Sequence, residues 1–295
     1  YKVCCVLVSK LTRKNINKLK ENNMSKYKLI AFDMDGTLLN SNKEILPGTL
    51  KAIQKAFDNG KEVVLCTGRC IAELNQYIKQ IPGLRYIIGV SGALVYDIKE
   101  KKAIYDNPLK PNQVNSILDV IKEVDAMPHI LTEKSIVQTK DTENMDHFHM
   151  GVYAPLFEQV ATKVDDIFEY YKQQQMNVEK LNVYHAKPKD RDNTREKLQN
   201  LDLVLANAEQ TSIEISAKGT TKGTGLEKLC QYLNINIEEA IAVGDADNDL
   251  DVLKKAGLGI AMENANANVK AVADVVVGDC NSDGCVTAIE EYLLK

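Results

Sequence analysis

The sequence of 295 residues contains no tryptophan and only five phenylalanines, so aliphatic side chains must supply most of its core. It also lacks an excess of either charge, because 37 Lys and Arg stand against 41 Asp and Glu, a net charge of −4. A nucleic-acid-binding protein usually carries a basic surplus. A disordered chain would have far fewer hydrophobic residues than the 44% found here. The composition therefore predicts a folded protein that does not bind nucleic acid.

Long apolar runs and paired cysteines are absent as well. No run approaches the roughly 18 apolar residues that a membrane-spanning helix needs, and the early run over residues 3–8 is too short for a signal-peptide core. The odd number of cysteines, with no CxxC pair, argues against a disulfide framework. We therefore expect a cytoplasmic protein without a membrane partner, in which all seven cysteines are free thiols: Cys4, Cys5, Cys66, Cys70, Cys230, Cys280 and Cys285.

Residues 1–23 differ in charge composition from the rest of the chain. They carry six basic residues and a single acid, and a methionine, Met24, follows them. We interpret Met24 as the natural start and residues 1–23 as an N-terminal extension that is not native. The alternative is a basic arm that contacts an anionic partner.

From residue 28 onward, strand and helix patterns alternate. Short apolar runs predict buried strands over residues 29–32, 63–66 and 86–90. Between them, residues 47–59 and 71–80 have the pattern of helices, the first with a proline in its opening turn. A βαβαβ pattern predicts a parallel sheet with right-handed crossovers.

The same alternation returns near the C-terminus, with helices over 222–233, 248–256, 266–273 and 286–294 and strands over 240–243, 259–262 and 275–277. The stretch between the two halves has polar, hairpin-like strands and two long helices, near 111–124 and 156–174. The expected fold class is α/β. A doubly wound parallel-sheet core spans residues 24–92 and 217–295, and an α+β domain is inserted over residues 93–216.

Two carboxylates follow the first predicted strand, in the segment Asp33-Met34-Asp35-Gly36-Thr37. Ligands of an open parallel sheet bind at the carboxyl ends of its strands, so these acids lie where chemistry is expected. Gly36 permits the tight turn that follows, and the Thr37 hydroxyl can fix it. The alternative is a turn with two solvated acids.

Two further segments have the character of anion sites. Thr67-Gly68-Arg69 follows the second strand, where a hydroxyl and backbone N–H groups at a helix start form a phosphate cradle. Lys222 opens a helix, a position where the macrodipole disfavours a cation unless a bound anion offsets it. The alternatives are an ordinary strand-to-helix turn and a solvated lysine.

A second group of acids follows the strand over 240–243, in the segment Gly244-Asp245-Ala246-Asp247-Asn248-Asp249. Oxygen ligands of this kind suit Mg²⁺; the alternative is a capping turn, which we expect for Asp247. A phosphate would be repelled by these acids, by about 4 kcal/mol per charge pair at 4 Å and an effective dielectric of 20. A divalent cation and Lys222 remove that objection, so the motifs together predict phosphoryl transfer.

The ordered set of motifs resembles the haloacid dehalogenase (HAD) superfamily, and specifically its Cof-type phosphatase branch, subclass IIB. The resemblance covers nearly all of residues 24–295. Ser91 and Ala246 stand where the family usually has Asn and Gly, which affects substrate contacts more than catalysis. Secondary marks agree with the family: Ser91-Gly92-Ala93, Glu214-Ile215, Ala261-Met262-Glu263-Asn264-Ala265 and Asp283-Gly284.

The resemblance implies a role for each motif residue. Asp33 attacks phosphorus and forms an aspartyl-phosphate, while Asp35 protonates the leaving oxygen and then activates water. Lys222 is the third catalytic residue. The implied phosphate-binding residues are Thr67, Gly68, Lys222 and Asn264, the last of which either contacts the phosphate or orients a neighbouring residue. The implied Mg²⁺ ligands are Asp33, the backbone carbonyl of Asp35, and Asp245, with Asn248 and Asp249 in support.

The inserted domain would be the family's cap, which closes over the site and selects the leaving group. We expect Arg69, Ser91, His147 and His149 to influence substrate specificity. The alternating His147 and His149 could share one face of a strand as zinc ligands; the alternatives are substrate contact and two surface histidines on a cap strand.

The predicted function is the Mg²⁺-dependent hydrolysis of phosphate monoesters of small metabolites, such as sugar or cofactor phosphates. A phosphomutase on the same scaffold is the first alternative. A non-catalytic sugar-phosphate sensor is the second, although a pure binder gains nothing from a nucleophile such as Asp33. The expected partner is a small phosphorylated substrate, and the oligomeric state stays open between a monomer and a weak dimer.

Overall fold

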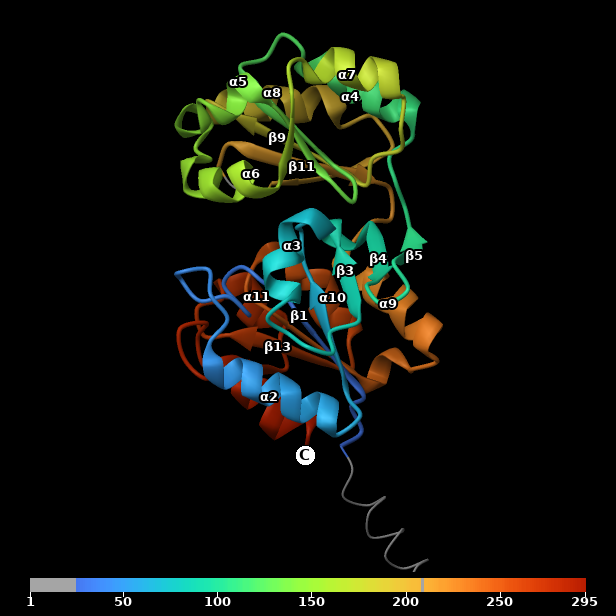
Figure 1. Cartoon of the computed structure of the whole chain (residues 1–295), viewed down its shortest axis with the longest axis vertical. Helices are drawn as coiled ribbons and strands as arrows, with labels where there is room; N and C mark the ends of the chain where they lie inside the picture. Colours follow the sequence, from blue (N-terminus) through green and yellow to red (C-terminus); the bar gives the residue numbers. More distant parts are fainter. Residues whose placement is uncertain (1–24, 208–209) are drawn as a thin grey trace, which may run out of the picture.

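The computed structural model describes residues 25–207 and 210–295, which form two sheets with their helices, one above the other in Figure 1. The expected extension over residues 1–23 lies outside the described residues. The lower unit holds both ends of the described chain, and the upper unit is formed by its middle. No helix in the described residues combines the length and the apolar composition needed to cross a membrane.

The lower unit is built on an eight-stranded sheet in the order β14-β13-β12-β1-β2-β3-β4-β5. Its first six strands run parallel, and β4 and β5 are antiparallel additions at the edge. The bounds are β1 Leu29–Phe32, β2 Glu62–Cys66, β3 Tyr86–Gly89, β4 Leu94–Asp97, β5 Lys102–Asp106, β12 Ala240–Gly244, β13 Leu258–Met262 and β14 Val275–Val277.

Helices cover both faces of this sheet, as the predicted doubly wound fold requires. In the central strand β1, Ile30 and Phe32 pack into one core while Leu29 and Ala31 pack into the other, because successive side chains point to opposite faces. One layer contains α2 Pro47–Asp58, α3 Ile71–Ile78, α12 Gly284–Thr287 and the π-helical η6 Ala288–Leu293; the other contains α9 Lys222–Leu233, α10 Leu250–Lys255 and α11 Ala267–Val272.

The upper unit is a six-stranded sheet in the order β10-β11-β9-β6-β7-β8, mostly antiparallel. Three helices pack on its outer face, and α6 lies on the face toward the lower unit (Figure 1). The strands are β6 Ala126–Leu131, β7 Ser135–Gln138, β8 Ala161–Val164, β9 Lys180–His185, β10 Leu203–Asn207 and β11 Ser212–Ala217; the helices are α4 Pro111–Ile121, α5 Thr139–Thr142, α6 Ala154–Val160, α7 Ile167–Gln174 and α8 Pro188–Leu198.

Two expectations for the inserted unit differ from the structure. Residues 156–174 do not form one helix: α6 ends at Val160, β8 follows, and Asp166 begins α7 by accepting hydrogen bonds from the N–H groups of Phe168 and Glu169. The hairpin β4–β5, expected in the insertion, pairs with β3 and extends the core sheet instead. The chain therefore leaves the core after β5 and returns after β11.

The two connections between the units lie side by side. The Asn107 amide, just beyond β5, donates hydrogen bonds to the Lys218 carbonyl at 3.0 Å and to the Thr220 hydroxyl at 2.9 Å. Thr221 then begins α9 as its N-cap. The outgoing and returning segments are thus tied together where they cross.

Candidate active site

The predicted catalytic acids lie at the carboxyl ends of adjacent strands. Asp33 follows β1 and Asp245 follows β12, and these strands are neighbours in the sheet. Thr67 follows β2 on the other side of β1. The Asp33 N–H donates to the carbonyl of Val243, which continues the ladder past the strand end. The parallel order therefore gathers motifs that are more than 200 residues apart in sequence.

Lys222 occupies the centre of this cluster. It is the first residue of α9, and its side chain is 1% exposed. Its ammonium group donates to Asp33 Oδ1 at 2.5 Å and to Asp249 Oδ1 at 2.7 Å. Burial lowers the pKa of Lys222, but the carboxylates of Asp249 and Asp33 outweigh it and hold that pKa well above its usual value. Two carboxylates thus offset the unfavourable helix-start position, where the sequence suggested a bound anion.

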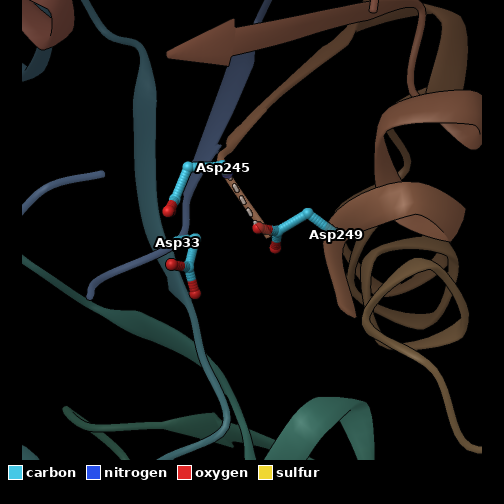
Figure 2. Close-up of side chains that lie close together, drawn as sticks. All are labelled: Asp33, Asp245 and Asp249. Atoms are coloured by element: carbon cyan, nitrogen blue, oxygen red, sulfur yellow. Dashed lines mark hydrogen bonds between the residues drawn. The ribbon is translucent and has the colours of Figure 1, made fainter. Parts of the chain in front are cut away.

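Three carboxylates, those of Asp33, Asp245 and Asp249, have oxygens within 4.8 Å of one another (Figure 2). Asp249 Oδ2 accepts hydrogen bonds from the N–H groups of Asp245 and Ala246, which fixes the turn after β12. The Thr37 hydroxyl donates to Asp245 Oδ1 at 2.8 Å. Asp249 is therefore committed to Lys222 and the backbone, while Asp33 and Asp245 keep further oxygens for a ligand.

The cluster has more negative charge than Lys222 alone balances. Burial raises the pKa of Asp33 to about 8; Lys222 opposes this rise, and the charges of Asp249 and Asp245 add to it. Burial likewise raises the pKa of Asp245. A set of buried carboxylate oxygens short of positive charge fits a hard divalent cation such as Mg²⁺.

The position beside this cluster, Gly36, can be occupied only by glycine. Its φ is +87°, a conformation that side chains rarely adopt, and a Cβ there would lie 2.5 Å from Asp245 Oδ2. The turn after β1 therefore approaches Asp245 more closely than any other residue would allow.

Asp35 has the opposite environment. Arg69 Nε and Nη2 donate to its two oxygens, each at 2.8 Å, and Lys43 Nζ donates to Oδ1 at 2.7 Å. Burial alone would raise the pKa of Asp35, but Arg69 and Lys43 outweigh it and bring that pKa down to about 2. Sequence reasoning missed Lys43, which lies in a loop outside every motif. Arg69, expected to contact substrate, lines the cavity while paired with Asp35.

The expected phosphate-binding residues divide into two groups. Thr67 and Gly68 line the cavity beside Asp33, and Thr67 Oγ1 accepts a hydrogen bond from the Arg69 N–H at 3.2 Å. Asn264 does not line it. Its amide donates to the Gly36 carbonyl at 2.7 Å, and its oxygen accepts from the Cys280 N–H at 2.9 Å. Asn264 thus orients the turn after β1, and its expected contact with phosphate has no support in this geometry.

The two predicted cap histidines are far from a shared strand face. His147 lies in the 3₁₀ turn Met145–Phe148 and contacts Asp125 at 2.9 Å. His149 follows it with a positive φ and contacts the Ala186 carbonyl at 3.1 Å. Neither lines the catalytic cavity, and they do not appear together in a metal-binding cluster of the described residues. The strand-face zinc site and the strand assignment are therefore wrong.

Ser91 connects the two units. Its φ of 59° presents the hydroxyl to the cap, where it donates to Glu214 Oε2 at 3.0 Å and accepts from Lys180 Nζ at 3.2 Å. Lys180 also pairs with Glu214 at 3.0 Å. This buried contact lies directly over Gly68, where an added Cβ would be 3.3 Å from Lys180 Nζ.

A cavity of about 310 Å³ lies between the core site and the cap. None of the cap residues that line it was predicted as a site residue. Those on strands are recognisable only by their alternation, and those between residues 150 and 157 lie on turns and on α6 and belong to no motif. The core contributes Asp33, Asp35, Thr67, Gly68, Arg69, Glu73, Ala246 and Asn248; the cap contributes His129, Leu131, Met150, Tyr153, Leu156, Phe157, Lys180, Asn182, Tyr184, Ser212 and Glu214.

Comparison with known proteins supports the resemblance to the haloacid dehalogenase superfamily that the sequence motifs indicated. The sequence model for haloacid dehalogenase-like hydrolases matches residues 30–289. The protein YxeH of Bacillus subtilis (strain 168) is 30% identical over 279 residues, covering 91% of this chain and 99% of YxeH. The 5-amino-6-(5-phospho-D-ribitylamino)uracil phosphatase YitU of the same organism is 29% identical over 271 residues, covering 90% of this chain and 97% of YitU.

Among solved structures, the HAD subclass IIB sugar phosphatase BT4131 has the same fold. It superposes with a TM-score of 0.74 at 23% identity, over 90% of this chain and 98% of that chain. The chain belongs to the haloacid dehalogenase-like hydrolases, among the Cof-type phosphatases of that family.

Proposed function

We propose that this enzyme is a Mg²⁺-dependent phosphomonoesterase that acts on small phosphorylated metabolites through an aspartyl-phosphate on Asp33. One observation carries the proposal: two carboxylates, two residues apart, lie at one strand end in opposite electrostatic settings. Asp33 is bound to Lys222 beside other acids, whereas Asp35 is held by two cations. Such a divergence gives paired carboxylates separate roles. Because burial and neighbouring acids raise the pKa of Asp33 to about 8, its role as nucleophile requires the positive charge of Lys222 and of a bound divalent cation, which would keep it ionised.

In the first step, an Asp33 oxygen attacks phosphorus as the ester P–O bond breaks. The leaving oxygen takes a proton from Asp35. Thr67 and the backbone of Gly68 receive the phosphoryl oxygens, and Lys222 offsets the charge that gathers between Asp33 and phosphate. In the second step, Asp35 takes a proton from water, the water oxygen bonds to phosphorus, and the Asp33–phosphorus bond breaks.

The cations around Asp35 set a condition on the first step. With Arg69 and Lys43 both in contact, Asp35 is ionised at neutral pH and suits the base role. To act as an acid it must first gain a proton, which requires that a cation turn away when substrate enters. Arg69 lines the cavity and Lys43 is half-exposed, so substrate contact can draw either side chain from Asp35.

Asp33, the Asp35 backbone carbonyl and Asp245 would hold Mg²⁺, with Asn248 and Asp249 in support. The ion supplies positive charge that lets a phosphate dianion approach these carboxylates. Asn248 lines the cavity and Asp249 is fully buried, which matches a supporting role for each.

The decisive variant is Asp33→Asn, which removes the nucleophile and little volume. We expect phosphate release from p-nitrophenyl phosphate to fall below detection, while circular dichroism and the thermal unfolding midpoint show a folded protein. Asp119→Asn, an exposed change on α4, is the matched control and should keep wild-type activity. Activity that persists in purified Asp33→Asn contradicts the mechanism.

A further inference from the structure

The cap face that closes the cavity is a regular array of side chains. Along β9, Lys180, Asn182 and Tyr184 point to the same side, because alternate residues of a strand share a face. Asn182 lies at the centre of this face. Its neighbours in register are Glu214 on β11 and His129 on β6, and all three line the cavity.

A chain of hydrogen bonds runs from Asn182 across this face toward the core. The contacts are Asn182 Nδ2 to Tyr184 Oη at 3.0 Å, Tyr184 Oη to His129 Nδ1 at 3.3 Å, and His129 Nε2 to Ser135 Oγ at 2.7 Å. On the core side, Glu73 Oε1 of α3 lies 3.7 Å from His129 Nε2.

The direction of this chain follows from the acceptors around His129. Its Nε2 faces the Ser135 hydroxyl at 2.7 Å and the Glu73 carboxyl at 3.7 Å, so Nε2 carries the ring proton and Ser135 accepts from it. Burial lowers the pKa of His129 to about 3, so the ring is neutral and its Nδ1 must accept from the Tyr184 hydroxyl. Tyr184 then accepts from Asn182 Nδ2. Each donor points toward Ser135, and the open end of the chain is the acceptor Asn182 Oδ1.

This open end has no partner within the part of the chain that the structure describes. Asn182 is 7% exposed, and its Oδ1 is buried without a hydrogen bond. Leaving a buried acceptor unpaired typically costs about 1–3 kcal/mol. The oxygen is buried in this structure, so a ligand that donates to it must displace neighbouring side chains as it binds.

Another part of the cap wall is apolar. Its lining residues between 150 and 157 are all hydrophobic or aromatic: Met150, Tyr153, Leu156 and Phe157. Phe157 packs on the His129 ring at a centroid distance of 4.9 Å. On the polar wall the cation Lys180 is already paired with Glu214, so that wall offers acceptors and little positive charge to a second anion.

We propose that Asn182 determines specificity by accepting a hydrogen bond from the leaving group, which is a neutral, flat ring bearing an O–H or N–H donor and joined to the phosphate through a methylene or short chain. The inference rests on the proposed phosphatase function and deepens it. The ring lies against the apolar wall, and its donor reaches Asn182 Oδ1, which the hydrogen-bond chain holds in the accepting orientation.

Three phosphate esters test the two parts of this proposal. Pyridoxine 5′-phosphate has a flat ring with hydroxyl donors; benzyl phosphate keeps the arylmethyl ester without donors; glucitol 6-phosphate has donors without a ring. We expect wild-type kcat/KM to be at least tenfold higher for pyridoxine 5′-phosphate than for either of the others, equivalent to about 1.4 kcal/mol. A preference for glucitol 6-phosphate or benzyl phosphate overturns the proposal.

Variants separate recognition from packing. Asn182→Leu should reduce the preference for pyridoxine 5′-phosphate over benzyl phosphate at least tenfold. Tyr184→Phe frees the Asn182 amide to rotate and should partly reduce the same preference for pyridoxine 5′-phosphate. Glu179→Gln changes the other buried oxygen without a partner among the described residues, one that does not line the cavity, and should leave the ratio unchanged. An unchanged ratio in both Asn182→Leu and Tyr184→Phe contradicts the role of Asn182.

Binding measured without turnover distinguishes this inference from the proposed function. Calorimetry with pyridoxine 5′-phosphate and benzyl phosphate on Asp33→Asn, and on the double variant with Asn182→Leu, gives the same ratio as a ratio of Kd values. If wild type releases phosphate neither from p-nitrophenyl phosphate nor from any of these esters, the proposed function fails, and the calorimetric ratio still decides the role of Asn182. A Kd ratio that Asn182→Leu does not change overturns it.

Discussion

The core site and the cap face use opposite means to hold their side chains. In the core, charges are interlocked: Lys222 binds two carboxylates, and Asp35 binds two cations. In the cap, neutral groups are joined by hydrogen bonds from Asn182 to Ser135, and Glu73 of the core lies 3.7 Å from His129 Nε2. Phosphoryl transfer needs fixed charge whatever the leaving group, whereas selection of the leaving group needs directional acceptors and shape.

The largest effect is expected for Lys222→Met, which removes the central cation of the core site. This change leaves Asp33 and Asp249 buried without their cation, so we expect unfolding to become easier by about 3–5 kcal/mol. We also expect kcat to fall on the order of 10²–10³-fold. Urea unfolding and phosphate-release assays measure the two effects. Lys218→Met, which removes an exposed ion pair with Asp202, is the control and should change stability by less than about 1 kcal/mol.

A smaller change, Gly36→Ala, tests whether the core charges need their spacing. The added Cβ displaces Asp245, so the Mg²⁺ concentration for half-maximal activity should rise roughly 10–100-fold. Raising Mg²⁺ should restore much of the activity, which it should not do for Lys222→Met. Gly60→Ala has a similar positive φ with nothing within 4 Å, and it isolates the backbone strain alone. Equal Mg²⁺ requirements in the two glycine variants would refute the spacing argument.

The mildest test concerns the neutral chain of the cap. The pKa of His129 is lowered in the folded protein, so the unfolded chain binds a proton first as pH falls from about 6.5 toward 3. Folding stability from this residue is therefore present above pH 6.5 and is lost on acidification, by up to about 1.4 kcal/mol per pH unit. His129→Gln should show a smaller loss between pH 7 and 5 in urea titrations. His147→Gln, at an exposed histidine, should follow wild type; a matching curve for His129→Gln would count against a buried neutral ring.

Sequence reasoning located the core site because its residues are local to strand ends. Asp33 and Asp35 follow a buried strand, and Asp245 follows another, so a periodicity argument places them at one edge. The same argument could not identify Lys43, because a loop lysine has no periodicity. Its contact with Asp35 depends on how the loop folds back.

The cap was less predictable for a different reason. Asn182 and Tyr184 face the cavity because they alternate along one strand. Their partner His129 lies on another strand, and the local sequence does not determine the register between the two strands. The helix expected over 156–174 failed because the N-cap at Asp166 competes successfully with helix continuation. The hairpin β4–β5 looked like cap sequence, and only its pairing with β3 assigns it to the core.

The hydrogen bonds of Asn107 to the returning segment have a mechanical consequence. They tie both crossings of the chain together at one place, so we expect any movement of the cap to turn about this place rather than to slide over the core. That pivot lies two residues before Lys222 in the chain. Asn182 and the apolar wall lie in the cap, beyond this contact, whereas Lys222 follows it closely in the chain. We therefore expect cap opening to displace the Asn182 face much more than the Lys222 ammonium that contacts Asp33.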